Sequence, residues 1–380
     1  MLGFDPTQEQ EALREMAHKF AANEIRPRAA EWDRDGVFPL ELFRKAFDLG
    51  LMTGFIPESY GGQGLSSLDT CFLEEEISWG CSGVATSMTA NGLALGPILL
   101  VGTEEQKRSF VAPFATAFRF ASFCLTEPGA GSDAGGIATT ARRDGDGYVL
   151  NGRKCFITNG AHASQYTVFA STDRSRGHKG LSAFVVPRET PGVSSGKKED
   201  KMGQRASETS DVLFEDVRVP EANRLGAEGE GFKIAMRTLD YARASVAAMA
   251  VGVARAAYEH AADYARQRVQ FGQPIAMNQA IYFLLADMAT DIEAARLLTW
   301  KAAWLADQGK RNTKESSFAK AFAADLAMRV TTDAVQIFGG YGYMKDYPVE
   351  KLMRDAKLLQ IYEGTSQIQR MVIAKETLLR

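Results

Sequence analysis

The sequence has few cysteines and histidines, and neither kind is clustered. Its 380 residues include four cysteines and four histidines. No two cysteines form a C-x-x-C pair, and the histidines are too dispersed for a set of metal ligands. We therefore expect no metal site and no catalytic dithiol, and predict reduced, mostly buried thiols.

A strong charge imbalance and long apolar runs are also absent. Lys and Arg number 44 against 47 Asp and Glu, so the formal net charge is only −3. This balance excludes the basic surface typical of partners of nucleic acids or membranes. No apolar run approaches the about 20 residues of a membrane span. Residues 1–4 show no targeting segment, so the sequence predicts a cytoplasmic protein of the bacterial type.

A dinucleotide-binding fingerprint is missing as well. The nearest candidate runs from Gly129 to Ala134, lacks the final glycine, and opens no clear βαβ unit. Any nucleotide cofactor must therefore be held in another way.

The sequence does contain three successive patterns, in the order helical, β, helical. The first begins at Asp5-Pro6, which offers a capping residue and a proline at the first helical position. It includes separate predicted helices over 67–78 and 86–100. From about residue 120 the sequence is rich in Gly, Thr and Val, and Asn151-Gly152 predicts a two-residue hairpin turn. Long amphipathic runs begin at Gly231.

These patterns predict an α+β multidomain fold. We expect an N-terminal helical domain over 1–120, a middle β-barrel or sandwich domain over 121–228, and a C-terminal four-helix bundle over 229–380.

Segments spread over nearly the whole chain resemble signatures of the acyl-CoA dehydrogenase family, in family order. They are 124–133 (CLTEPGAGSD), 156–160 (FITNG), 266–272 (RQRVQFG), 336–340 (QIFGG), 347–355 (YPVEKLMRD) and 361–370 (IYEGTSQIQR). The resemblance implies an FAD-dependent enzyme of the short- or medium-chain type. The family's fold agrees with the order of patterns.

The resemblance implies that Glu363 is the catalytic base. Oxidising an unactivated Cα–Cβ bond requires removal of an α-proton and transfer of a β-hydride, which a flavin accepts. Because the α-proton is weakly acidic, the base needs an apolar site that raises its pKa. In the family, the backbone N–H of the base and a flavin ribityl hydroxyl polarise the thioester oxygen. Taken alone, Glu363 would be an exposed loop residue.

Further residues are implied around FAD. Thr158 corresponds to the threonine that meets flavin N5, and Phe156 to an aromatic beside the ring. Phe156 could also be a plain β-core aromatic, and both interpretations can hold together. The other residues implied at the cofactor of the same subunit are Phe123, Leu125, Thr126, Gly131, Ser132, Thr365 and Gln367. Those implied at the FAD of a neighbouring subunit are Arg268, Gln270, Phe271, Gln336, Gly339 and Gly340.

Contacts across subunits imply an obligate homodimer, usually paired into a homotetramer. A solvated arginine at a helix end would explain Arg268 equally well. The residues implied at the acyl-CoA substrate are Ser132, Asp240, Arg243, Tyr362 and Gly364. A surface ion pair at i, i+3 would explain Asp240 and Arg243 equally well.

Residues expected to line the substrate pocket restrict the range of acyl groups but do not identify one. The stretch 84–91 lacks the arginine with which some relatives bind a dicarboxylic acyl group. Ala242 stands near the position where isovaleryl and long-chain relatives place their base, and Tyr362 should resist α-branching. Thr89 replaces an acidic residue of medium-chain relatives. A short- to medium-chain acyl group is favoured, and its length stays open.

Two alternatives remain. One is a related flavin oxidase or monooxygenase acting on a non-CoA substrate, against which Glu363, Arg243 and Ser132 argue. The other is a non-catalytic flavoprotein, against which Glu363 argues. For a dehydrogenase, the expected electron acceptor is an electron-transfer flavoprotein.

Overall fold

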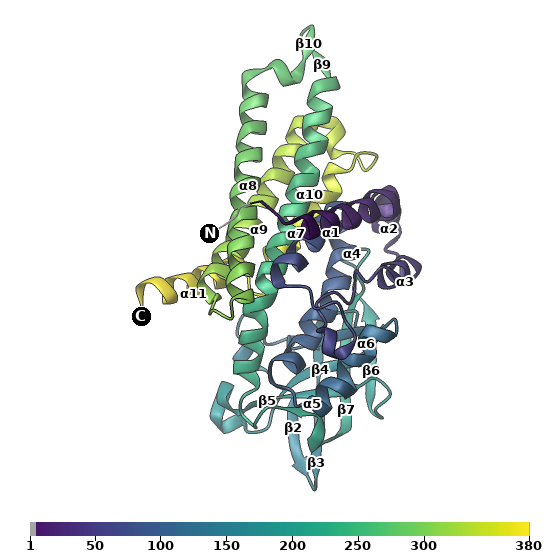
Figure 1. Cartoon of the computed structure of the whole chain (residues 1–380), viewed down its shortest axis with the longest axis vertical. Coiled ribbons are helices and arrows are strands. Elements are labelled where there is room, and N and C mark those ends of the chain that lie inside the picture. Colours follow the sequence, from purple (N-terminus) through teal and green to yellow (C-terminus); the bar gives the residue numbers. More distant parts are fainter. Residues whose placement is uncertain (1–4, 380) are drawn as a thin grey trace.

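The computed structural model describes residues 5–379 and has the predicted order of helical, β and helical parts (Figure 1). The interpretation of residues 1–4 lies outside the described residues. The N-terminal helices are α1 (Gln8–Phe20), α2 (Ala29–Asp35), α3 (Leu40–Asp48), α4 (Ser67–Val101), α5 (Glu104–Phe110) and α6 (Ala112–Thr116). The main strands are β1 (Phe120–Cys124), β2 (Thr140–Asp144), β3 (Gly147–Thr158), β4 (Ala163–Ser171), β5 (Leu181–Pro187), β6 (Val193–Lys198), β7 (Thr209–Pro220) and β8 (Arg224–Leu225).

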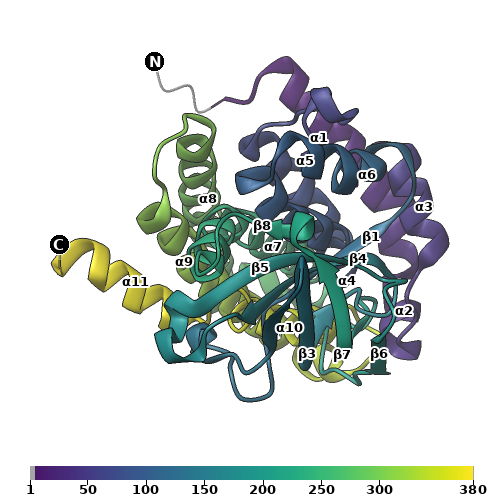
Figure 2. The ribbon, with the colours of Figure 1, turned by 90° about the horizontal axis from the view of Figure 1, so that it is seen from below.

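The C-terminal part is built on three long helices. Its elements are α7 (Gly231–Gln267), β9 (Val269–Gln270), β10 (Gln273–Pro274), α8 (Gln279–Asp307), α9 (Thr313–Phe338), α10 (Val349–Leu359) and α11 (Ser366–Leu378). Figure 1 shows α7, α8 and α9 side by side, with the β9–β10 turn at one end and the β-sheet at the other. Figure 2 shows α11 projecting away from the body of the protein.

The first helix begins two residues later than predicted. Its N-cap is Thr7, whose hydroxyl accepts a hydrogen bond from the backbone N–H of Gln10 at 3.2 Å, while the Gln10 side chain accepts one from the Thr7 backbone at 3.0 Å. The prediction of Asp5 as the cap is wrong, because this reciprocal capping box satisfies two helix-end donors at once.

The two helices predicted over 67–78 and 86–100 form one element, α4, with non-helical backbone at Cys81. By length and composition α4 could cross a membrane, contrary to the expectation that no apolar run approaches that length. However, 61% of its most apolar window is buried inside the protein. All four cysteines are buried and free.

The β domain is one eight-stranded sheet, in the order β6-β7-β3-β2-β4-β5-β8, with β1 parallel to β4. The hairpin turn predicted at Asn151-Gly152 is wrong, because both residues lie inside β3 at an irregularity of its pairing with β7. The chain instead turns between Asp144 and Gly147, where Gly145 has a φ of 63°. Glycine adopts this left-handed conformation without the clash that a Cβ would cause.

Helices α4 and α7 pack with their backbones almost in contact. A Cβ built on Gly252 of α7 would lie 2.2 Å from the carbonyl oxygen of Glu75 in α4. Near this contact, the Ser78 hydroxyl donates to the Met249 carbonyl at 2.8 Å. Only glycine allows this close approach, which fixes the spacing of the two helices that flank the site described below.

We predict that Gly252→Ala destabilises the protein, because its methyl group would collide with rigid backbone. Overpacking of this kind costs about 1–3 kcal/mol of unfolding free energy, measured by denaturant titration. Gly92→Ala in α4 is the matched control, since a Cβ there comes no closer than 3.8 Å to Phe55. Equal stability of the two variants would contradict the proposed close contact.

Candidate active site

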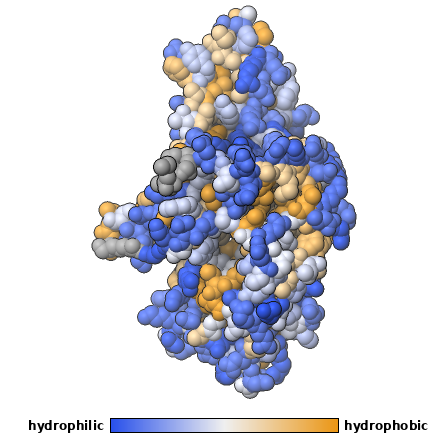
Figure 3. Space-filling model, in the orientation of Figure 1, coloured by the Kyte–Doolittle hydropathy of each residue, from blue (hydrophilic) through white to orange (hydrophobic). Residues whose placement is uncertain are grey.

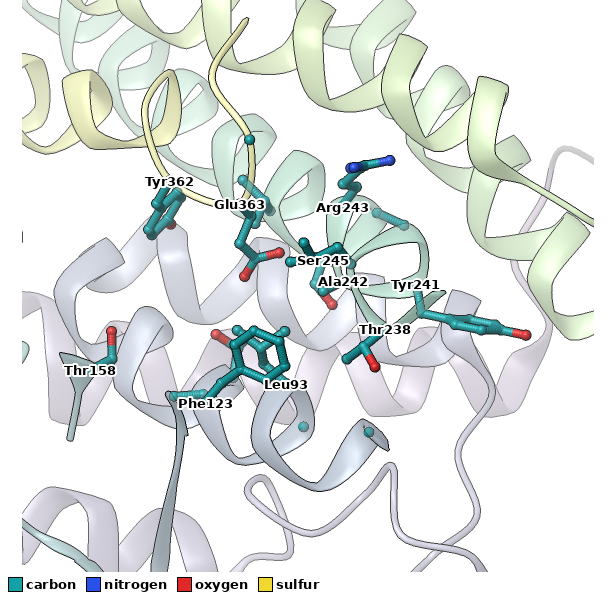
Figure 4. A pocket seen from close by; sticks show the side chains of 18 of the residues that line it. Leu93, Phe123, Thr158, Thr238, Tyr241, Ala242, Arg243, Ser245, Tyr362 and Glu363 are labelled. Atoms are coloured by element: carbon teal, nitrogen blue, oxygen red, sulfur yellow. The ribbon is translucent and has the colours of Figure 1, made fainter. Parts of the chain in front are cut away.

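A cavity of about 840 Å³ lies where the three parts of the chain meet. Its walls come from the ends of β1 and β3, from α4 and α7, and from the loop between α10 and α11. Figure 4 shows Tyr362 and Glu363 reaching from this loop toward Phe123 and Thr158 on the opposite wall. Volumes of 300–1,000 Å³ are typical of small-molecule sites.

Glu363 stands on a tightly held turn. Its φ is 53°, and Gly364 follows with a φ of 91°. The Gly364 carbonyl accepts hydrogen bonds from Lys320 Nζ at 2.6 Å and from Gln369 Nε2 at 3.0 Å. Thr365 then caps α11 by accepting a hydrogen bond from the Ile368 backbone N–H. The turn is therefore anchored on both sides of the carboxyl group.

The Glu363 carboxyl group faces the cavity without a full set of partners. Its Oε2 is buried and accepts no hydrogen bond. Burial raises the pKa of Glu363 to about 7, although the charges of Lys320 and Arg243 lower it. A carboxylate with such a pKa is a general base suited to neutral pH.

Two other titratable groups near Glu363 were not identified from the sequence. Glu74 of α4 lines the same cavity, and burial together with the charge of Glu363 raises its pKa to about 8. Burial lowers the pKa of Lys320, which is fully buried in α9, to about 8. Lys320 lies in a largely apolar helical stretch and Glu74 is one of three consecutive glutamates, so no local signal distinguishes either as a site residue.

The opposite wall contains Phe123, Phe156 and Thr158, three of the residues that the resemblance implies at the cofactor. Phe156 is 66% exposed, so the alternative of a β-core aromatic is wrong. Its φ of 56° is unusual for a strand residue. An uncovered aromatic ring beside an apolar cavity fits a site for a planar ring system.

The loop that follows β1 borders the same space, through Leu125, Thr126, Gly131 and Ser132. A Cβ built on Gly131 would meet nothing within 4 Å, so the backbone here faces open space. Behind the loop, fully buried Lys154 donates to Glu127 Oε1 at 2.7 Å and to the Leu125 carbonyl at 3.1 Å.

Arg243 lies in the cavity wall, whereas Asp240 does not line it. The two form an ion pair at 2.6 Å, and Asp240 also accepts a hydrogen bond from the Thr313 hydroxyl. Arg243 is only 4% exposed, so a surface ion pair does not describe it. Tyr362 and Gly364, which the resemblance implies at the substrate, also line the cavity.

The remaining predicted residues lie elsewhere. Arg268, Gln270, Gly339 and Gly340 line a second cavity, of about 450 Å³, at the end of α7 and α9 where the β9–β10 turn lies (Figure 1). Other predicted cofactor residues lining neither cavity are Phe271, which is 98% exposed, Gln336, Thr365 and Gln367.

Comparison with known proteins shows one family across all three parts. Sequence profiles of the acyl-CoA dehydrogenase N-terminal, middle and C-terminal domains match residues 7–117, 122–217 and 229–378. The chain belongs to the acyl-CoA dehydrogenase family. This confirms the predicted fold class, the predicted activity and FAD as the cofactor.

Several members of the acyl-CoA dehydrogenase family are closely similar. The mitochondrial short-chain specific acyl-CoA dehydrogenase of Bos taurus is 51% identical over 95% of this chain and 88% of its own. The structure of butyryl-CoA dehydrogenase from Megasphaera elsdenii superposes with a TM-score of 0.97 at 47% identity, covering 100% of both chains. A chain from a structure described as electron transferring flavoprotein of Acidaminococcus fermentans matches with a TM-score of 0.98 at 47% identity, again covering 100% of both.

The residues of this acyl-CoA dehydrogenase fit FAD. An uncovered aromatic ring, an open glycine backbone and an unpartnered carboxyl oxygen all face one apolar cavity. Among the described residues, no group of three or more His, Cys, Asp or Glu could hold a metal ion.

We predict that Lys154→Met destabilises the dehydrogenase and weakens its retention of FAD. Without the ammonium, the buried Glu127 carboxylate loses its partner, and breaking such a pair costs about 3 kcal/mol of unfolding free energy. Arg153→Met, which loses the ion pair between the exposed Arg153 side chain and Asp211, should cost under about 1 kcal/mol. Equal unfolding free energies for the two variants, from denaturant titration, would refute the role of the buried pair.

Proposed function

We propose that Glu363 removes the α-proton of a short-chain acyl-CoA during its oxidation to the 2,3-enoyl-CoA. The observation that carries the proposal is the buried, unpartnered carboxyl oxygen of Glu363, which faces Phe123 and Thr158 across an apolar cavity. Bound FAD supplies the acceptor for the β-hydride. An acyl chain bound between these walls would have its α-carbon facing Glu363 and its β-carbon facing FAD.

The chain's own residues would prepare the substrate for proton removal. Burial keeps water from the Glu363 carboxylate, which raises its basicity toward that needed for a weak carbon acid. The backbone N–H of Glu363 would donate to the thioester oxygen, where negative charge develops as the proton leaves. Arg243 and Lys320 add positive charge near the carboxylate and favour its ionised form.

The residues that would hold FAD form two groups. Phe123, Leu125, Thr126, Phe156 and Thr158 border the main cavity on its β side, with Gly131 and Ser132 at the edge of the same loop. The group formed by Arg268, Gln270, Gly339 and Gly340 lies at the other end of α7, around the second cavity. We propose that this group reaches the FAD of a second subunit, together with Phe271 and Gln336. Thr365 and Gln367 would contact FAD from the start of α11.

A second copy of the chain has an apolar surface on which to pack. Figure 3 shows apolar residues gathered over the upper helices. The exposed large apolar residues of this region include Val269, Phe271, Met277, Tyr282, Phe283, Tyr341, Tyr343 and Met344. Such a patch is typical of a subunit interface and supports a homodimer or homotetramer.

A short, straight acyl chain is the proposed substrate. The similar proteins named for short-chain and butyryl-CoA activity support it. Tyr362 closes one side of the cavity, with its hydroxyl 3.4 Å from that of Thr86. Ala242 and Thr89 also line the cavity, and no arginine lies within 84–91 to bind a dicarboxylic acyl group.

An electron-transfer flavoprotein is the proposed electron acceptor, supported by the similarity to a chain from the Acidaminococcus structure. The location in the cytoplasm stays a prediction from the sequence.

Anaerobic titration with acyl-CoAs of increasing chain length tests this function. We expect C4 and C6 acyl-CoA to bleach the oxidised flavin band of the FAD-loaded protein faster than C12 or an α-branched acyl-CoA. Glutaryl-CoA should reduce the flavin poorly, because no arginine pairs with its free carboxylate. An absence of bleaching across the panel would refute the dehydrogenase activity.

We predict that Glu363→Gln retains FAD but slows flavin reduction by about 10²–10⁴-fold, the contribution of a positioned general base. In the wild type, the base must be ionised, so the reduction rate should rise with pH to half its maximum near pH 7. Stopped-flow reduction by butyryl-CoA between pH 5.5 and 9 measures both effects. A wild-type rate in Glu363→Gln would show that another group is the base.

A further inference from the structure

Lys320 is a buried lysine at the active site to which the proposed reaction gives no direct step. It is fully buried in α9, and its Nζ donates to the Gly364 carbonyl at 2.6 Å. Glu363 directly precedes Gly364 in the chain, and its negative charge acts on Lys320. A buried lysine that contacts the turn of the base can act on the position of the base and on its charge.

The turn has a conformation that needs support. Glu363 has a φ of 53°, which costs a residue with a Cβ about 1–3 kcal/mol relative to ordinary backbone. The bonds that hold it come from two buried side chains, Lys320 and Gln369, which both donate to the Gly364 carbonyl. Gln369 also donates to the Glu363 carbonyl at 3.2 Å.

We propose that Lys320 is a positioning residue of the catalytic base: it holds the turn and, together with Arg243, supplies positive charge that favours ionised Glu363. The proposal rests on the assignment of Glu363 as the base. Gln369 supports the turn through hydrogen bonds alone, because its amide is neutral. Comparing substitutions of Lys320 and Gln369 therefore distinguishes the effect of holding the turn from the effect of the positive charge.

The charged groups around Lys320 come from several elements. Lys320 interacts electrostatically with Glu363 in the loop before α11 and with Arg243 in α7. It also interacts with Asp325, which lies in α9 like Lys320. Glu74 of α4 is coupled to Glu363 from the far wall. Arg243 already pairs with Asp240, and Asp325 pairs with Arg370. Lys320 forms no ion pair among those found in the described residues, so its charge is left to act on Glu363.

The test compares Lys320→Met with Gln369→Met, two substitutions that keep an unbranched side chain of similar volume. Both should lower the rate of flavin reduction by butyryl-CoA, because both loosen the turn. Only Lys320→Met removes a positive charge, so only it should raise the pKa of Glu363. Because the base acts when ionised, its pH–rate curve should move to higher pH, by about one unit.

Infrared difference titration gives a readout independent of turnover. The carboxyl C=O band that disappears in Glu363→Gln should titrate at higher pH in Lys320→Met than in the wild type or Gln369→Met. Lys320→Gln, which loses the charge but keeps a donor, serves if Lys320→Met does not fold, and Lys320→Arg should restore the wild-type curve. An unmoved curve and band in the uncharged variants would overturn the proposal.

The Glu363→Gln result separates the two possible failures. If that variant reduces flavin at the wild-type rate, the assignment of the base itself is wrong. If it does not, and the Lys320 variants keep the wild-type pH dependence, only the role of Lys320 is wrong. Equal shifts of the pH–rate curve in Lys320→Met and Gln369→Met would also overturn the proposed role of Lys320. They would show that the geometry of the turn, and not the charge, sets the pKa of Glu363.

Discussion

The burial of the Glu363 carboxyl group is the constraint on which the arrangement of the rest of the structure depends. A base for a carbon-bound proton has to be kept from water, yet an ionised group in an apolar cavity is unstable unless charge or hydrogen bonds compensate it. No single domain encloses the cavity: the β domain gives one wall, α4 and α7 the second, and the loop before α11 carries the carboxylate. The three parts of the chain must therefore pack together before the proposed base has its apolar site.

The packing of α4 against α7 sets the width of this cavity. At Gly252 the two backbones nearly touch, whereas farther along the pair, at Thr89 and Ala242, both helices line open space. A contact between backbone atoms cannot be relaxed by changing a rotamer, unlike a contact between flexible side chains. The shape of the acyl site is thus fixed by a position that the substrate never meets.

Periodicity in the sequence was enough to predict most elements. The long amphipathic runs predicted to begin at Gly231 do begin there, with α7, because the helical pattern starts at a clear loop residue. The hairpin turn was misplaced, because Asn151-Gly152 has the composition of a turn but sits at an irregularity inside β3, while Gly145 makes the real turn. A turn prediction depends only on residues adjacent in the chain, and the pairing of β3 with its neighbouring strands outweighs the local turn preference of Asn151-Gly152.

The site was predicted less completely, and for a different reason. Resemblance located Glu363, Thr158 and Phe156, since these lie in recognisable segments. It did not point to Glu74, Lys320 or Lys154, which lie outside these segments and acquire their roles only through burial.

Their placement explains how two carboxyl groups share one cavity. Lys320 and Arg243 lower the pKa of Glu363, whereas among the described residues only the Ser245 hydroxyl lowers that of Glu74. Like charges in one apolar site resist simultaneous ionisation, so the carboxyl group with cations beside it ionises first. The cations thus favour the ionised form of Glu363 over that of Glu74, which agrees with the proposed role of Glu363 as the base.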